Sequence, residues 1–205
     1  YRFIGEIVFG LSSARRVFRL RKTTDLVIIT SPPFFSTLLT AFSCRVFALR
    51  YVIDVRDRYP QVFFSLGIFR PSSSFGRYLL SLERGLYRKA SLVTSVTAQM
   101  CVAIKNDCKV DAKLVMNGYD ANLFYPTTPH PRQEETRIIM HGLFGNFFDS
   151  ITFINIASAC LRMGRKHRFY LIGYGPKLDD VRAAGLSNVE FLGEMPQVEL
   201  AQIVR

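Results

Sequence analysis

The sequence lacks the residue patterns of a metal-binding or disulfide-stabilised protein. Its four cysteines form no CxxC pair, and none of its three histidines lies at ligand spacing from them. Cys44, Cys101 and Cys160 fall in apolar, helix-like runs, where a free thiol behaves as a small hydrophobic group. We therefore expect four reduced thiols in a cytoplasmic protein, with no metal site and no bound cofactor.

A long apolar run is also missing. The longest such stretch, from Phe34 to Phe42, is too short to span a bilayer and is soon followed by Arg45, so we expect a buried helix there. The composition, 49% hydrophobic and 21% charged, is that of a globular protein rather than a disordered one. The chain begins at Tyr1 rather than at a methionine and ends at Arg205 within a helical pattern, so we expect it to be truncated at both ends.

Acidic residues are scarce in the first part of the chain. Residues 1–125 hold 18 Lys and Arg against 8 Asp and Glu, whereas residues 126–205 hold 9 against 8. A basic half indicates an anionic partner, such as a membrane surface, a phosphorylated lipid or a nucleic acid, although a soluble surface with excess arginine gives the same count. The basic residues are scattered, and no RNP, zinc-finger or helix-turn-helix signature accompanies them, so we expect no nucleic-acid binding.

Short apolar runs alternate with longer helical patterns in the first part. Leu26–Thr30 is a β-branched run typical of a buried strand, and Ser31-Pro32-Pro33 ends it. We expect further strands at 51–55, 91–96 and 113–116, helices at 34–49, 77–89 and 98–105, and a loop with short helical pieces at 61–75. In the 77–89 helix, Tyr78, Leu82 and Leu86 repeat at helical spacing. This alternation predicts a parallel sheet with right-handed crossovers.

The pattern is interrupted at 126–136 (PTTPHPRQEET), where three prolines and no aliphatic residue predict a linker. It then restarts, with strands expected at 137–140, 168–172 and 188–192 and helices at 149–163, 177–184 and from 196 onward. We therefore expect an N-terminal domain at 1–125, the linker at 126–136, and a C-terminal domain at 137–205. Both domains are predicted to be α/β, with doubly wound parallel sheets.

Two glycine-bearing loops follow strands of the second domain. The first is His141-Gly142-Leu143-Phe144-Gly145-Asn146, and the second is Gly173-Tyr174-Gly175-Pro176. Glycines let the backbone approach a ligand, and a phosphate can accept hydrogen bonds from loop N–H groups at the positive end of the following helix. Because ligands bind beyond the carboxyl ends of parallel strands, the two loops together indicate a nucleotide-type ligand. Taken alone, the GxxG spacing fits a tight βα turn equally well.

A charged cluster follows the 51–55 strand of the first domain, with Asp54, Arg56, Asp57 and Arg58. A carboxylate beside arginines stays ionised and can orient a hydroxyl or accept its proton, but a structural ion-pair network is an equal alternative. The three histidines are weak candidates for metal ligands, and only His141 adjoins a glycine loop.

Seven segments, in order along nearly the whole chain, carry a family resemblance. They read DLVIITSPPFFSTLL, YVIDVRDRYPQ, ERGLYRKASLVTSVT, KLVMNGYDANLF, IIMHGLFGN, FYLIGYGP and NVEFLGEMPQVELAQI. Together they resemble the retaining glycosyltransferases of family 4, which have the GT-B fold of two Rossmann-like domains. The resemblance is to the branch that builds bacterial surface polysaccharides.

The resemblance implies roles for residues of both domains. In the second domain it implies donor-binding roles for Gly142, Gly145, Asn146, Gly173, Gly175, Pro176, Gly193 and Met195. In the first domain it implies that Asp57 lies near the reacting sugar, where relatives often have a histidine. The acceptor side would include Ser31, Pro32, Arg56 and Arg58, together with the 59–75 loop.

Two features of the family are missing from the chain. No Arg or Lys follows Gly145 closely, where many relatives have one, and Asn146-Phe147-Phe148-Asp149 stands there instead. Neutralisation of the leaving diphosphate would then need another cation. The Glu-x7-Glu segment that holds the donor sugar is expected after Arg205, and the first-domain glycine loop before Tyr1.

The resemblance implies a transferase that moves a sugar from a nucleoside-diphosphate sugar to an acceptor hydroxyl with retention of configuration, without a bound metal. It would act in exopolysaccharide, capsule or O-antigen synthesis. A polyprenyl-linked or saccharide acceptor would bring the basic first domain to the anionic inner face of the plasma membrane. A nucleotide-sugar epimerase or phosphorylase of the same fold, and a non-catalytic nucleotide-sugar-binding module, remain open as alternatives.

Overall fold

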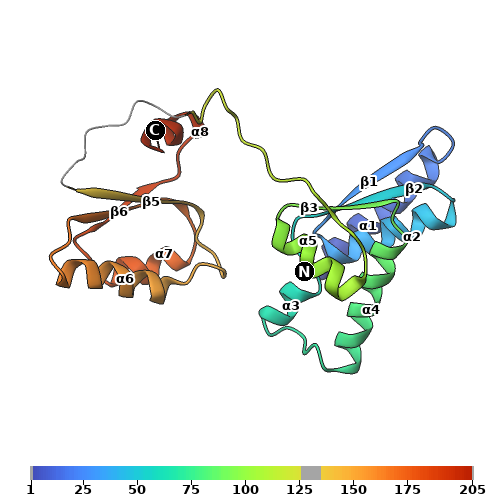
Figure 1. The fold of residues 1–205 in the computed structure, drawn as a ribbon, viewed down its shortest axis with the longest axis horizontal. Coiled ribbons are helices and arrows are strands. Elements are labelled where there is room, and N and C mark those ends of the chain that lie inside the picture. The colour runs from blue at the N-terminus through green and yellow to red at the C-terminus, as the bar shows by residue number, and fades with distance from the viewer. Residues whose placement is uncertain (1, 126–134, 205) are drawn as a thin grey trace. The chain divides into compact units, whose positions relative to one another are not determined.

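The computed structural model describes residues 2–125 and 135–204, and the chain divides into two compact units, Tyr1–Gly118 and Tyr119–Arg205 (Figure 1). We call them unit 1 and unit 2. The predicted linker at 126–136 lies almost entirely outside the described residues, so it stays a prediction.

Unit 1 contains a parallel sheet with the strand order β1-β2-β3-β4. Its strands are β1 (Leu26–Ser31), β2 (Arg50–Val55), β3 (Leu92–Ser95) and β4 (Lys113–Leu114). Its helices are α1 (Arg2–Leu20), α2 (Phe34–Val46), α3 (Gln61–Ser65), α4 (Ser74–Arg88) and α5 (Ala98–Cys108). The predicted parallel sheet is confirmed, although β4 is shorter than the strand expected at 113–116.

Helix α2 ends at Val46, three residues earlier than expected. Ala48 adopts a left-handed conformation with φ 55°, and this turns the chain away from the helix axis. The Leu49 N–H then donates to the Cys44 carbonyl at 2.8 Å, which satisfies a carbonyl at the helix end. The apolar residues after Val46 continued the helical pattern in the sequence, which is why the end was predicted too late.

Helix α4 begins at Ser74, three residues before the predicted start. The Ser73 hydroxyl accepts a hydrogen bond from the Gly76 N–H at 3.0 Å and so caps the helix. The buried face also differs from the prediction, since Leu79 is buried whereas Tyr78 is 57% exposed. Leu86 of the predicted stripe is buried and Leu82 is partly buried, so the prediction was wrong for Tyr78.

Helix α1 covers residues for which the sequence made no prediction, and it packs closely against α2. A Cβ at Gly10 would lie 2.9 Å from Ser36 Cα, so the glycine permits the close approach of the two helices. Further along, the Ser43 hydroxyl donates to the Ala14 carbonyl at 3.3 Å. Small residues thus permit the close approach of the two helices at these two points.

The core of unit 1 lies between the sheet and its helices. It is formed by buried residues from β1, β2 and β3 together with residues from α1, α2, α4 and α5, including Ile53, Val93 and Ile104. Residues that alternate with the buried ones along β1 and β3, such as Ile28 and Leu92, are exposed. One face of the sheet is therefore packed and the alternating positions point away from that core.

Unit 2 contains a second parallel sheet, with the strand order β5-β6-β7 (Figure 1). Its elements are β5 (Thr136–Leu143), α6 (Ser150–Arg162), β6 (His167–Tyr174), α7 (Lys177–Ala183), β7 (Val189–Gly193) and α8 (Gln197–Val204). Helices α6 and α7 lie side by side under one face and share a core with Phe169 and Leu171 of β6. Every strand and helix predicted for this half is present, with β5 and β6 longer than expected.

Candidate functional site

The carboxyl ends of β5, β6 and β7 surround a cavity of about 300 Å³. In open parallel sheets, this is the edge at which ligands bind. The cavity is lined by residues from the three strand ends and from α8: His141, Gly142, Leu143, Ile172, Gly173, Tyr174, Glu194, Met195 and Leu200. The two glycine loops and the 193–195 segment therefore converge on one cavity within unit 2.

Gly173 and Gly175 allow the two loops to pack against each other. A Cβ at Gly173 would lie 2.0 Å from the Gly142 carbonyl oxygen, and a Cβ at Gly175 would lie 2.3 Å from the Phe144 carbonyl oxygen. Both glycines also have positive φ, at 133° and 143°. The Phe144 N–H donates to the Tyr174 carbonyl at 2.8 Å, which joins the same two loops. Contact between the loops is sufficient to explain both glycines.

Gly142 differs from these two glycines. Its φ is 130°, yet none of the described atoms lies within 4 Å of a Cβ placed there. Gly193, at the end of β7, combines φ 73° with the same open surroundings. By contrast, Gly145 has no positive φ, and a Cβ there would make only an ordinary contact with Leu143 at 3.6 Å. Gly142 and Gly193 thus leave room for a ligand beside the backbone.

The carboxylate of Asp149 occupies the positive end of helix α6. It accepts hydrogen bonds from the Thr152 N–H at 3.0 Å and from the Thr152 hydroxyl at 2.7 Å. These bonds lower the pKa of Asp149, so the group carries its negative charge at neutral pH. A diphosphate would be repelled at this helix end and would have to bind to N–H groups of the loops.

The described lining of the cavity contains neither lysine nor arginine. The polar side chains of the lining are those of His141, Tyr174 and Glu194. Lys177, the first residue of α7, is paired with Asp180 at 3.2 Å, and the Ser150 hydroxyl donates to the same Asp180 oxygen at 2.8 Å. The sequence has no cation shortly after Gly145. Among the described residues, no other cation lines the cavity in its place.

The cavity includes some of the predicted donor-binding residues and not others. Gly142, Gly173 and Met195 line it. Among the rest, Asn146 is exposed in the turn before α6, and Pro176 precedes the first turn of α7. The donor-binding roles of all the predicted residues, those that line the cavity included, stay predictions.

The sequence reasoning did not identify several of the lining residues. Ile172 and Leu200 lie outside the predicted donor-binding segments, whereas Leu143, Tyr174 and Glu194 lie within or beside them but were given no role of their own. Most of these residues are next to a glycine at a strand end. That position was the signal in the sequence by which they could have been found. Leu200 lies on α8, and nothing local in its sequence indicates that it faces this edge.

The corresponding edge of unit 1 contains a buried ion-pair network around Arg58. Its guanidinium donates to both carboxylate oxygens of Glu83, at 3.0 Å and 3.2 Å, and to Asp107 at 2.7 Å. The Gln61 amide donates to Glu83 at 2.9 Å. The Arg58 side chain is only 10% exposed and that of Glu83 only 1%. Arg58 therefore belongs to a structural ion-pair network, which was the alternative considered for the charged cluster. The acceptor role of Arg58 stays a prediction.

Burial raises the pKa of Glu83, and the hydrogen bonds and charges of Gln61 and Arg58 partly offset this effect. Burial beside the same carboxylate also raises the pKa of Cys108 to about 12, so this thiol stays protonated. The network thus links the loop after β2 to helices α4 and α5 and keeps a nearby thiol unreactive.

The other charged residues of this edge remain closer to solvent. Arg56 donates to Asp54 at 2.8 Å and also to Asn117, and Asp54 accepts from the Thr94 hydroxyl at 2.8 Å. Burial works to raise the pKa of Asp54, but the bonds from Arg56 and Thr94 outweigh it and lower that pKa. Asp57 is exposed, and within the described parts of the chain no side chain is bonded to its carboxylate.

Ser31 and Pro32 lie at the end of β1, beside this cluster. The Ser31 carbonyl accepts from the Arg56 N–H at 2.8 Å, which places the ends of β1 and β2 together. Ser31 itself is 1% exposed, so its side chain does not face solvent. Asp57 is thus the predicted first-domain residue with a free, exposed functional group.

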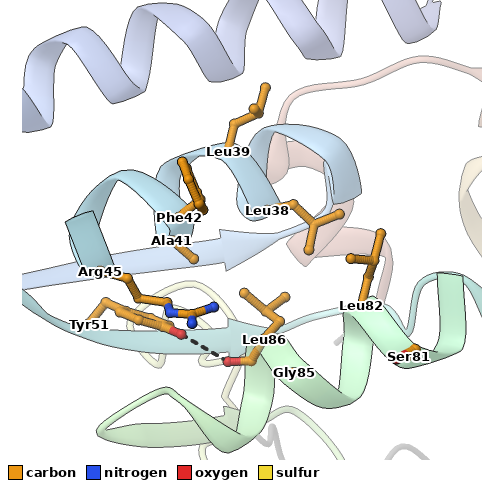
Figure 2. Close-up of a pocket in the computed structure, with 10 residues that line it drawn as sticks. All are labelled: Leu38, Leu39, Ala41, Phe42, Arg45, Tyr51, Ser81, Leu82, Gly85 and Leu86. Atoms are coloured by element: carbon orange, nitrogen blue, oxygen red, sulfur yellow. Dashed lines mark hydrogen bonds between the residues drawn. The ribbon is translucent and has the colours of Figure 1, made fainter. Parts of the chain in front are cut away.

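A second cavity of about 320 Å³ lies between α2 and α4 in unit 1 (Figure 2). Leu38, Phe42, Leu82 and Leu86 supply apolar walls, and Arg45 is the charged residue among them. Figure 2 shows the Tyr51 hydroxyl donating to the Leu86 carbonyl, at 3.1 Å. This cavity is away from the strand ends and offers few polar groups, so we assign no substrate chemistry to it.

The described residues contain no group of three or more His, Cys, Asp or Glu side chains that could hold a metal ion. All four cysteines are free, with Cys44 and Cys108 buried. In the described part of the chain, no helix is both long enough and apolar enough to cross a bilayer.

Comparison with known proteins gives matches among solved structures. No family model and no curated protein sequence matches the chain. Anabaena Alr3699/HepE in complex with UDP matches with a TM-score of 0.65 and 16% identity, over 93% of this chain and 53% of that protein. The lipopolysaccharide outer core galactosyltransferase WaaB, in its apo form, matches with a TM-score of 0.57 and 14% identity, over 100% and 52%.

A third match is WaaG, a glycosyltransferase involved in lipopolysaccharide biosynthesis, with a TM-score of 0.52 and 11% identity. The chain spans about half the length of HepE and WaaB. At these identities the similarity concerns the fold. It confirms the predicted class, which is two Rossmann-like doubly wound parallel-sheet domains of the GT-B type.

Proposed function

We propose that this protein is a glycosyltransferase that uses a nucleoside-diphosphate sugar as its donor. The observation that carries the proposal is the cavity at the carboxyl ends of β5–β7, where the lining residue Gly142 combines positive φ with open space, as does Gly193 next to the lining residue Glu194. A nucleotide needs this combination, because its phosphates accept hydrogen bonds from exposed backbone N–H groups and its sugar needs room beside them.

The solved structures with the same fold support this choice of donor. HepE has been observed with UDP and with UDP-glucose. WaaB is named as a galactosyltransferase and WaaG as a glycosyltransferase of lipopolysaccharide biosynthesis. By analogy, the donor nucleotide would occupy the edge formed by Gly142, Gly173 and Met195, and the pathway would be synthesis of an exopolysaccharide, capsule or O-antigen.

The transfer is proposed to retain the anomeric configuration and to need no bound metal. Asp57 is the proposed catalytic residue because its exposed carboxylate lies at the strand-end edge of unit 1 and can orient or deprotonate a hydroxyl. Ser31, Pro32, Arg56 and Arg58 would shape the acceptor side. The leaving phosphate would assist deprotonation of the acceptor, so no enzymic nucleophile is required.

The acceptor is proposed to be a polyprenyl-linked or free saccharide at the inner face of the plasma membrane. The basic residues are concentrated in 1–125, with 18 Lys and Arg against 8 Asp and Glu. An anionic surface attracts such a distribution, by roughly 1 kcal/mol for each cation that comes close. The protein would then be cytoplasmic and peripherally associated with the membrane.

The proposal can be tested by incubating the protein with UDP-glucose, UDP-galactose or GDP-mannose and a lipid-linked or saccharide acceptor. We expect one donor to give a glycosylated product whose anomeric configuration, read by NMR, matches that of the donor. Asp57→Asn should lower the rate and leave donor binding unchanged. Interconversion of the sugars without transfer would favour an epimerase, and binding without turnover would favour a binding module; either result would contradict the proposal.

A further inference from the structure

Helix α1 presents its small residues to the protein and its large apolar residues to the outside. Its packed side includes Gly10 against α2, Ala14, and Val17 in the core of unit 1. Its outer side includes Ile4, Val8 and Leu11, which are 65%, 61% and 57% exposed. Burial of small residues and exposure of large aliphatic ones is the reverse of what a helix needs for packing on its own unit.

Five of the exposed residues form a stripe along the helix, and further exposed apolar residues, such as Ile7, Phe9 and Phe18, lie beside it. Residues 4, 8, 11, 15 and 19 follow helical spacing and so share a face. The first three are Ile4, Val8 and Leu11, and the last two are Arg15 and Arg19, both exposed. We call these five residues the α1 stripe. It is apolar in its first half and cationic in its second.

The surroundings of the α1 stripe strengthen its positive end. Arg16, Arg21 and Lys22 lie close in sequence, and the Arg21 guanidinium is 4.1 Å from the ring centroid of Phe18. The acidic residue of the helix, Glu6, is 8% exposed and accepts from the Phe35 N–H at 3.4 Å, so it faces the protein. No carboxylate on the described residues of α1 therefore opposes the cations at the outer face.

We propose that the α1 stripe binds directly to an anionic lipid bilayer. The apolar half would enter the boundary between headgroups and acyl chains, and the arginines would contact lipid phosphates. This inference rests on the proposed function, because it supplies the element that brings the enzyme to a membrane-bound acceptor. It names α1 as that element, which the overall charge count cannot do.

The charge pattern argues against a second copy of the chain as the partner. A two-fold contact between antiparallel α1 helices would place the apolar half of each stripe against the arginines of the other. A parallel contact would place the arginines of the two copies together, and like charges repel. An anionic bilayer satisfies both halves at once, because it offers acyl chains and phosphates at the same surface.

The test is co-sedimentation of the protein with vesicles of phosphatidylcholine alone and of phosphatidylcholine with phosphatidylglycerol. We expect binding to the anionic vesicles that weakens as salt is added. The double variants Val8→Glu/Leu11→Glu and Arg15→Ser/Arg19→Ser should each bind at least about tenfold more weakly, since each cation near an anionic surface contributes about fivefold. All four side chains are exposed, so folding should be preserved, and circular dichroism checks this.

Two controls outside α1 match these changes. Val102→Glu alters an exposed valine on α5, and Arg162→Ser removes an exposed cation from unit 2; both should bind vesicles as the unaltered protein does. Equal partitioning to neutral and anionic vesicles, or α1 variants that bind like the controls, would overturn the inference. So would a dimer, seen by sedimentation velocity, that Val8→Glu/Leu11→Glu dissociates.

UDP titration of the same samples separates this inference from the proposed function. The α1 variants should bind UDP as the unaltered protein does, because α1 is in unit 1 and the nucleotide cavity is in unit 2. If the protein bound UDP but no vesicles, the docking inference would fail and the proposed donor site would stand.

Discussion

The strand-end edges of the two sheets are built in opposite ways. In unit 1, charged side chains occupy the edge, and the most buried of them, Arg58 and Glu83, bind each other. In unit 2, the edge has glycines at the strand ends, with Gly142 and Gly173 lining a cavity that has no lysine or arginine in its described lining. Both edges lie at the carboxyl ends of the parallel strands of their sheet.

This difference shows how the same edge can serve structure or ligand binding. A guanidinium that already donates to two carboxylates has little capacity left for a substrate. Strand-end glycines that face open space leave room for a ligand beside the backbone. The charged motif of unit 1 is therefore largely structural, apart from Asp57. The glycine motif of unit 2 is the weaker signal in the sequence, yet it marks the cavity.

The largest expected effect tests the structural reading of the unit 1 edge. Glu83→Ala should lower the free energy of unfolding by about 3–5 kcal/mol, because it leaves Arg58 charged, buried and without its main partner. Asp107→Ala removes the partially exposed partner of the same arginine and should cost no more than about 1 kcal/mol. Urea denaturation measures both values. Similar losses for the two variants would show that the buried pair does not hold this edge.

The next effect tests the glycine edge of unit 2. Gly173→Ala should destabilise unit 2 by about 3 kcal/mol, because the added methyl meets the Gly142 carbonyl at 2.0 Å and φ is 133°. Gly145→Ala is the matched control and should be nearly neutral, since its Cβ makes an ordinary contact and its φ is not positive. Thermal unfolding distinguishes the two. A neutral Gly173→Ala would mean that the loops are not packed as described.

A smaller effect concerns the helix end beside the cavity. Asp149→Asn removes the negative charge at the start of α6, and we expect UDP to bind more tightly in this variant because repulsion of its phosphates is relieved. Asparagine can still accept from the Thr152 N–H, so the helix should remain capped. Calorimetric titration of the variant and the unaltered protein measures the change. Weaker binding to Asp149→Asn would assign the carboxylate a positive role in nucleotide binding.

The smallest effect uses the cysteines of α5 as reporters. Cys108 has its pKa raised to about 12 by burial and by Glu83, so it should react with iodoacetamide far more slowly than Cys101 at pH 8. Peptide mapping by mass spectrometry gives the extent of modification at each site. In Glu83→Ala the rate at which iodoacetamide modifies Cys108 should rise. An unchanged rate of modification would indicate that the network does not control access to the thiol.

Much of the fold could be predicted because the strands are compact, β-branched and separated by clear breaks. Every strand expected in both units is present, and the glycine loops were correctly located at strand ends. The end of α2 was misjudged because the left-handed turn at Ala48 has no glycine or proline to signal it. Tyr78 was wrongly assigned to the buried face of α4, because that face includes Glu83, a buried carboxylate that a hydrophobic pattern cannot reveal.

The candidate site was only partly predictable for a similar reason. Glycine spacing locates loops, but it does not separate Gly173, which permits packing, from Gly142, which faces open space. Likewise, Arg56 and Arg58 look alike in the sequence, and the structural role of Arg58 is decided by Glu83, which is 25 residues away along the chain. Long-range partners of this kind become visible only in the folded structure.

The most direct test of the central claim is titration of UDP into three forms of the protein by calorimetry. Leu143→Trp would fill the cavity from its lining, whereas Phe147→Trp changes an exposed residue of the following turn that does not line it. We predict that the unaltered protein and Phe147→Trp bind UDP with similar affinity and that Leu143→Trp binds at least about tenfold more weakly, a loss of about 1.4 kcal/mol. Equal affinities in all three forms, or no UDP binding by the unaltered protein, would contradict the assignment of this cavity to the donor nucleotide.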